Sequence, residues 1–222
     1  MFVLVPGAGG SAWYWHRVVS ELRARGHEAV AVGLPAADES SGLPEYADTV
    51  AAAIGDHADT VLVAQSMGGF TAPMVCARVP VGQLVLVNAM VPLPGETPGQ
   101  WWGNTGSEPA RLAAAEAGGY GAEFDLDTYF LHDVPADVAA AGAGHEQPEA
   151  DIAFNQPCDI ERWPGTTTRV LAATGDRFFP VDFQRRVARD RLGIEAETIP
   201  GGHLAALSHP SPLVDKLVES LP

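Results

Sequence analysis

The sequence is poor in positive charge. It contains a single lysine, Lys216, and 12 arginines against 28 acidic residues, so its formal net charge is −15 at pH 7. A protein that binds the phosphate backbone of a nucleic acid needs a basic surface. We therefore expect no nucleic-acid partner, and an anionic substrate would be repelled on approach.

Cysteines and long apolar runs are also scarce. The two cysteines, Cys76 and Cys158, are too few for a disulfide framework and are typical of a protein kept in a reducing cytoplasm. No apolar run is long enough to cross a bilayer, and residues 1–7 lack the basic region of a secretion signal. We expect a cytoplasmic protein without a membrane span, and the sequence leaves homodimer formation open.

The acidic residues are concentrated in one segment. Residues 91–165 contain 13 acidic residues and two arginines, together with many prolines, glycines and aromatics but no strand signals. Such a length is too great for a simple loop in a compact domain. We expect this segment to be an inserted, mainly helical cap on a core formed by residues 1–90 and 166–222.

Outside that segment, short apolar runs alternate with amphipathic stretches. The expected strands cover residues 2–5, 28–32, 60–65, 83–88, 168–174 and 195–199. The expected helices cover residues 13–25, 43–57, 67–78, 108–117, 125–132, 181–191 and 212–219, the last capped by Ser211. This alternation predicts an α/β fold with a doubly wound, mostly parallel sheet flanked by helices. Ligands of such sheets bind beyond the carboxyl ends of the strands.

One of these strand–helix junctions has the pattern of a nucleophile elbow. The run Val61–Gly69 reads Val-Leu-Val-Ala-Gln-Ser-Met-Gly-Gly, an apolar strand that ends in Ser66 and is followed by two glycines. A sharp turn of this kind pushes one hydroxyl into the open, and small residues flank it because a Cβ would clash there. The usual first glycine is replaced here by Ala64. We interpret Ser66 as a nucleophile rather than as part of an ordinary loop.

A serine hydroxyl needs a base, and the base needs a carboxylate that orients it. In this arrangement the partners follow the serine in the order acid, then histidine. Asp176 lies in a Gly-Asp turn directly after a strand, and His203 lies in a Gly-Gly-His loop directly after the next strand. The sequence therefore predicts a catalytic triad of Ser66, Asp176 and His203, although a Gly-Asp pair can also form a plain turn.

The loop after the first strand is expected to complete the site. An oxyanion needs two N–H donors, and we assign the backbone amides of Met67 and Ala8. A glycine-rich turn can instead bind a dinucleotide, but Ala12 stands where that fingerprint has its third glycine. No pair of histidines has metal-ligand spacing on a helix. We expect neither a cofactor nor a metal.

With these motifs, the chain resembles the α/β-hydrolase superfamily over essentially its full length. The run Val5–Trp15 is similar to the opening of the branch that holds plant methyl-ester esterases and hydroxynitrile lyases, with Pro6 in place of the usual histidine. The lyases of that branch resemble one another in a threonine of the oxyanion loop and a lysine after the catalytic histidine. This chain has Gly7 and Leu204 there, and Leu204 cannot supply a cation for departing cyanide.

The resulting hypothesis is a carboxylesterase-type serine hydrolase that acts through an acyl-enzyme on a small, apolar, non-anionic ester. The expected pocket residues are Gly7, Met90, Val91, Trp101, Trp102, Tyr129, Phe130, Leu131 and Leu204. Two alternatives stay open. One is a dedicated lactonase, thioesterase or cyclase of secondary metabolism on the same triad, and the other is a ligand-binding receptor or a hydroxynitrile-lyase-like member.

Overall fold

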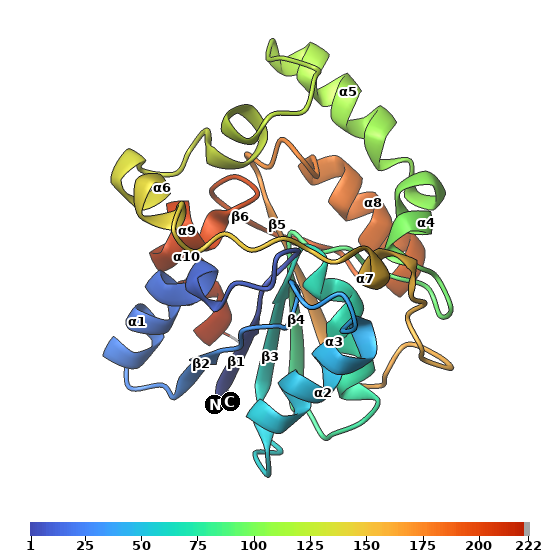
Figure 1. The fold of residues 1–222 in the computed structure, drawn as a ribbon. Helices are drawn as coiled ribbons and strands as arrows, with labels where there is room; N and C mark the ends of the chain where they lie inside the picture. Colours follow the sequence, from blue (N-terminus) through green and yellow to red (C-terminus); the bar gives the residue numbers. More distant parts are fainter. Residues whose placement is uncertain (220–222) are drawn as a thin grey trace.

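A six-stranded parallel sheet lies between two layers of helices in the computed structural model, which describes residues 1–219 (Figure 1). The strands are β1 (Phe2–Val5), β2 (Ala29–Ala31), β3 (Val61–Gln65), β4 (Gln83–Val87), β5 (Thr167–Ala173) and β6 (Glu197–Ile199). Their order in the sheet is β2-β1-β3-β4-β5-β6, and every neighbouring pair is parallel. The doubly wound, parallel α/β sheet expected from the sequence is confirmed.

Alternation of side chains along each strand divides the core into two halves. In β1, Val3 and Val5 belong to one apolar cluster, whereas Phe2 and Leu4 belong to the other. Helices α2 (Leu43–Ile54), α3 (Gly68–Cys76) and α8 (Val181–Leu192) pack on the first face. A 3-10 turn (Ala12–Trp15) and helices α1 (His16–Ala24), α9 (Ala205–Ser208) and α10 (Pro210–Val218) pack on the second. Because both faces are covered, the strands β1, β3 and β4 are apolar except for Gln65 and Gln83.

The last helix starts earlier than expected. Helix α10 begins at Pro210, directly after His209, so the predicted cap Ser211 lies inside the first turn. Its hydroxyl donates a hydrogen bond to Glu21 of α1 instead. The predicted core extends to residue 222, and residues 220–222 lie outside the described part of the chain. None of the helices within residues 1–219 has the length and apolar character needed to cross a membrane.

Residues 91–165 connect β4 to β5 and contain no strand in this fully described segment. Their helices are α4 (Pro98–Thr105), α5 (Ser107–Gly118), α6 (Ala136–Gly142) and α7 (Asp151–Asn155), and a π-helical turn covers Asp127–Leu131. The expected helices at 108–117 and 125–132 correspond to α5 and to that turn. Helices α4, α6 and α7 were not predicted because stretches of eight, seven and five residues are too short to establish an amphipathic period. The strap, residues 143–150 between α6 and α7, crosses the carboxyl edge of the sheet (Figure 1).

A buried ion pair fastens the start of this segment to the core. Glu96 accepts hydrogen bonds from the guanidinium of Arg191 on α8, from Asn104 at 2.8 Å and from the amide of Leu93 at 3.1 Å. Arg191 also donates to the carbonyl of Val91 at 2.6 Å. Burial disfavours the charged carboxylate, but these hydrogen bonds outweigh burial and lower the pKa of Glu96 below its ordinary value.

We expect Glu96→Gln to destabilise the protein by about 3–5 kcal/mol at pH 7, because Arg191 would remain buried without its counter-ion. A lowered pKa in the folded state contributes stability above the ordinary pKa of 4.5 and loses it as the pH falls through the folded value. The difference in the free energy of unfolding between wild type and variant should therefore become smaller at acid pH. Urea unfolding at pH 7 and in acid measures it.

The control is Glu195→Gln, which removes an exposed ion pair with Arg189 (3.2 Å). We expect this control to change stability by less than about 1 kcal/mol. Equal losses in the two variants would contradict an anchoring role for Glu96.

Candidate active site

Ser66 stands at the end of β3, in the middle of the sheet, and is followed at once by α3. Its φ is +49°, a left-handed conformation that is uncommon outside glycine. The Ser66 carbonyl accepts hydrogen bonds from the amides of Gly69 (3.0 Å) and Met90 (2.9 Å), which stabilise the turn. The strand–turn–helix geometry expected at Ser66 is present.

The glycines after Ser66 are required by close packing of the backbone. A Cβ placed on Gly69 would lie 1.9 Å from the carbonyl oxygen of Met90, and one on Gly68 would lie 2.6 Å from that of Pro6. Ala64, which replaces the usual first glycine, is fully buried in the apolar cluster that packs on α3. Its methyl group fits the core, so this departure from the motif does not disturb the turn.

Of the three residues predicted as a triad, His203 lies within hydrogen-bonding distance of both Ser66 and Asp176. The Nε2 atom of His203 is 3.1 Å from the Ser66 hydroxyl, and its Nδ1 atom is 2.9 Å from a carboxylate oxygen of Asp176. Asp176 follows β5 and His203 follows β6, so all three lie beyond the carboxyl ends of parallel strands. Both Asp176 and His203 are buried.

The Asp176 carboxylate is held by four donors. One oxygen accepts the amides of Phe178 (2.9 Å) and Phe179 (2.8 Å), and the other accepts Gln184 Nε2 (3.2 Å) and the His203 ring. A buried charge needs such partners to offset its lost hydration. The Gly-Asp turn therefore holds a buried carboxylate against the histidine ring.

Asn88 holds the histidine loop from the next strand, and sequence reasoning missed this role. It follows β4 with φ +47°, and its amide nitrogen donates to the carbonyls of Gly202 (3.0 Å) and His203 (3.2 Å). Its oxygen accepts the amide of Ala173 at 2.7 Å and faces Gln184 Nε2 at 3.4 Å. An asparagine at the carboxyl end of a central strand was the available signal. Gln184 lies inside α8, and nothing in the sequence around it indicated a role at the site.

Three phenylalanines surround the His203 ring. The rings of Phe130, Phe178 and Phe179 lie 4.8, 5.1 and 5.1 Å from it, each meeting it edge to face. They limit the access of water to the imidazole and hold it in one orientation. Phe178 and Phe179 come directly after Asp176, whereas Phe130 comes from the segment 91–165.

Ala8 lies in the loop after β1 and lines the same cavity as Ser66 and His203. Met67 directly precedes α3, where amides lack acceptors within the helix. The strap holds the Ala8 loop, because Glu149 accepts hydrogen bonds from the Gly9 amide and from the Tyr46 hydroxyl, each at 2.6 Å. Burial raises the pKa of Glu149, although these two hydrogen bonds oppose the shift. Sequence analysis did not identify Glu149.

The cavity beside Ser66 has a volume of about 150 Å³. Of the expected pocket residues, Gly7, Phe130 and Leu204 line it, and Leu131 lines the cavity next to it. Met90, Val91, Trp101, Trp102 and Tyr129 do not line the cavity at Ser66, contrary to expectation.

These five side chains make contacts away from the cavity at Ser66. Trp101 is fully buried against Phe179 and donates to the Val91 carbonyl at 3.1 Å, and the Met90 and Val91 side chains are buried in the same apolar cluster. The buried Tyr129 donates to the carbonyl of Gly121 at 2.7 Å. Trp102 lines a separate cavity with Arg111 and Phe124. An aromatic-rich sequence does not reveal which rings face a cavity, because that depends on helix orientation.

Comparison with known proteins agrees with this geometry. "Probable esterase PIR7A" of Oryza sativa subsp. indica is 40% identical over 108 residues, which cover 43% of this chain and only 41% of the rice protein. "Methylesterase 3" of Arabidopsis thaliana is 26% identical over 248 residues, covering 98% of this chain and 94% of the relative. The solved structure of polyneuridine aldehyde esterase has a TM-score of 0.77 at 19% identity, covering 98% of this chain and 97% of that one.

The family model described as "Alpha/beta hydrolase family" matches residues 2–216, nearly the whole chain. The sheet order, the sharp turn at Ser66 and the contacts among Ser66, His203 and Asp176 agree with that match. The chain therefore belongs to the alpha/beta hydrolase family.

Proposed function

We propose that this protein is a serine carboxylesterase with Ser66, His203 and Asp176 as its catalytic triad. The observation that carries the proposal is the continuous hydrogen-bonded path from the Ser66 hydroxyl through the His203 ring to Asp176. The Ser66 end of this path lines a cavity that the oxyanion loop also lines. A nucleophile, a base and an orienting acid in this order perform acyl transfer.

In the first step, the Ser66 oxygen forms a bond to the ester carbonyl carbon while His203 Nε2 takes the hydroxyl proton. The negative charge moves onto the carbonyl oxygen, which the amides of Ala8 and Met67 stabilise. When the tetrahedral intermediate collapses, the bond to the alcohol oxygen breaks and His203 returns the proton to the departing alcohol. The acyl group is then bound to Ser66.

In the second step, water takes the place of the alcohol. His203 removes a proton from the water as its oxygen bonds to the acyl carbon, and the intermediate collapses to release the carboxylic acid and the Ser66 hydroxyl. Asp176 remains ionised throughout and stabilises the positive charge of the imidazolium. Asn88 maintains the backbone position of His203 in both steps.

Esterase activity is favoured over a lyase activity by the cavity itself. Among the described residues that line it there is no lysine or arginine, and the residue after His203 is Leu204. A lyase needs a cation to receive cyanide, whereas an ester needs only the proton that His203 supplies. The names of the relatives, esterase and methylesterase, agree with this choice.

We infer two further properties of the protein. Residues 91–165 act as a cap, since their strap lies over the oxyanion loop and their Phe130 packs on His203. A reducing cytoplasm fits the two free thiols, Cys76 and Cys158. Burial raises the pKa of Cys76 to about 11 and that of Cys158 to about 12. Thiols with such pKa values stay protonated and unreactive near pH 7.

The test is hydrolysis of p-nitrophenyl esters of increasing acyl length by wild type and by Ser66→Ala. We expect the variant to lose about four orders of magnitude or more in kcat, since the nucleophile is removed. Ser20→Ala is the control, because Ser20 is an exposed serine of α1 that lines neither cavity, and this variant should retain full activity.

Absence of turnover by folded wild-type protein would overturn the proposal that the protein is a general esterase. The dedicated biosynthetic enzyme would then become the preferred function if a lactone or thioester were consumed in a Ser66-dependent way. A rise in melting temperature on adding a ligand, without formation of any product, would favour the alternative of a ligand-binding receptor.

A second prediction concerns Asn88→Ala. Loss of its hydrogen bonds to the histidine loop should reduce kcat by about 10- to 100-fold and stability by about 1–3 kcal/mol, since buried polar groups lose their partners. The same change at the exposed Asn155 is the matched control and should alter neither quantity appreciably. Reduced stability with unchanged kcat, measured where the variant is fully folded, would show that Asn88 does not position His203.

A further inference from the structure

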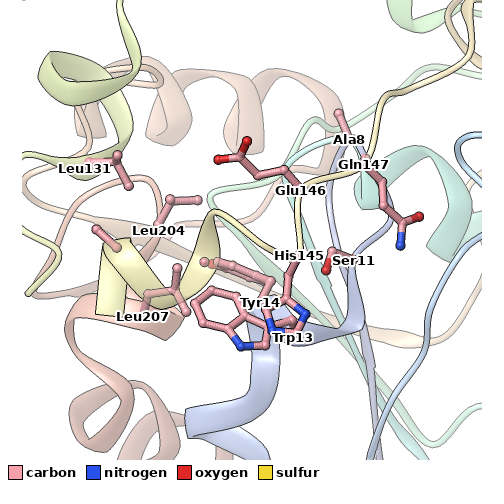
Figure 2. A pocket seen from close by; sticks show the side chains of 13 residues that line it. Ala8, Ser11, Trp13, Tyr14, Leu131, His145, Glu146, Gln147, Leu204 and Leu207 are labelled. Atoms are coloured by element: carbon pink, nitrogen blue, oxygen red, sulfur yellow. The ribbon is translucent and has the colours of Figure 1, made fainter. Parts of the chain in front are cut away.

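A second cavity of about 250 Å³ adjoins the cavity that contains Ser66 (Figure 2). The two share four lining residues, namely Ala8, Ser11, Tyr14 and Leu204. A substrate whose ester carbonyl lies at Ser66 can therefore extend past Tyr14 and Leu204 into the second cavity. The strap and α6 cover this cavity on the side away from the sheet.

The walls of the second cavity are mainly apolar. Trp13, Leu131, Leu204 and Leu207 supply large hydrophobic side chains, and no lysine or arginine occurs among the described residues that line it. Glu146 adds a carboxylate at the exposed rim. These walls fit an apolar group without negative charge. At ~30 Å³ for each water-sized group, the cavity holds about eight non-hydrogen atoms.

Trp13 makes one wall rigid before any ligand binds. Its ring is stacked between His16 at 4.4 Å and His145 at 5.1 Å. A Cβ on Gly142 of α6 would lie 3.1 Å from the same ring, so the helix backbone packs directly against it. A preformed apolar wall favours a ligand group of definite shape because little ordering is needed on binding.

Tyr14 places one polar group at the junction of the two cavities. The residue is 8% exposed, and its hydroxyl has no hydrogen-bond partner within residues 1–219. Figure 2 shows the phenol directed toward the side of the pocket formed by Leu204 and Leu207. Burial raises the pKa of Tyr14 far above its ordinary value, and the backbone amide of Ala206 opposes this shift only in part.

The hydroxyl of Tyr14 therefore keeps its proton, and its oxygen faces the Ala206 amide. What the group lacks is an acceptor for that proton. Buried hydroxyls are rarely left in this state, so a ligand or an ordered water is expected to supply the acceptor.

We propose that the second cavity binds the larger, apolar part of a neutral ester, and that Tyr14 donates a hydrogen bond to a second oxygen of this substrate. That oxygen, an ether or keto oxygen, lies between the reacting carbonyl and an aryl-sized group. The inference rests on the proposed esterase function and makes Tyr14 a specificity-determining residue for it.

The experiment compares wild type with Tyr14→Phe, which removes only the hydroxyl, on ester pairs that differ by one oxygen in place of a methylene. One pair is methyl phenoxyacetate and methyl 3-phenylpropionate, with the large group in the acyl part. The other is 2-phenoxyethyl acetate and 3-phenylpropyl acetate, with the large group in the alcohol part. We expect Tyr14→Phe to lower kcat/KM about 10-fold for the oxygen-containing member of one pair and less than about 2-fold for its partner.

Because each ratio compares the variant with wild type on the same ester, the intrinsic reactivity of that ester cancels before the two members of a pair are compared. Equal effects of Tyr14→Phe on both members of both pairs would overturn the role of Tyr14, and would fit a hydroxyl bonded only to water.

The cavity is tested separately with Ala139→Phe, which should reduce hydrolysis of the aryl-containing esters but spare methyl acetate, because Ala139 lines the cavity. Ala140→Phe, one residue further along α6 and exposed, is its matched control. Equal activity of these two variants toward the aryl-containing esters would overturn the assignment of the second cavity as a substrate site.

Failure of the esterase function itself has a different signature. If wild type hydrolysed no ester, binding of methyl phenoxyacetate and 2-phenoxyethyl acetate to Ser66→Ala, with and without Tyr14→Phe, would still be measured by calorimetry. Weaker binding of either ligand in the double variant would support the site independently of catalysis, and equal or absent binding of both would overturn it.

Discussion

The sharp turn from β3 into α3 is the constraint on which the rest of the site depends. Ser66 and Asn88 are the two non-glycine residues with positive φ within residues 1–219, and they end adjacent strands. Backbone strain of this kind persists only where the surroundings enforce it. Here Met90 enforces the turn in two ways. Its carbonyl oxygen leaves no room for a side chain at Gly69, and its amide donates a hydrogen bond to the Ser66 carbonyl.

A buried polar network holds the side chains around His203 in place beyond this edge of the sheet. The carboxylate of Asp176, the side chain of Gln184 and the side chain of Asn88 bond to one another or to the backbone around His203. Such a network is costly when incomplete and rigid when complete. The imidazole is therefore placed by several independent contacts, which three phenylalanine rings supplement.

Several contacts attach the acidic segment 91–165 to the core. Glu149 bonds to the oxyanion loop, Phe130 packs on His203, and Glu96 is buried against Arg191. These two carboxylates are exceptions in a segment whose other acidic residues mostly face solvent. The contacts explain how one segment can both cover the site and define the cavity next to it, where Tyr14 provides a polar group.

The sequence by itself determined the parallel α/β class and the positions of Ser66, Asp176 and His203, each in the turn after a strand, because these signals are local. A strand is a short apolar run, and a motif lies within a few residues of it. Only the tertiary structure decided the functions of Asn88 and Glu149, which act on residues 114 and 140 positions away. It also decided that Phe130 faces the site whereas Trp101 is buried elsewhere. The physical reason is that hydrogen-bond partners and cavity walls depend on helix orientation in space, which a pattern along the chain does not contain.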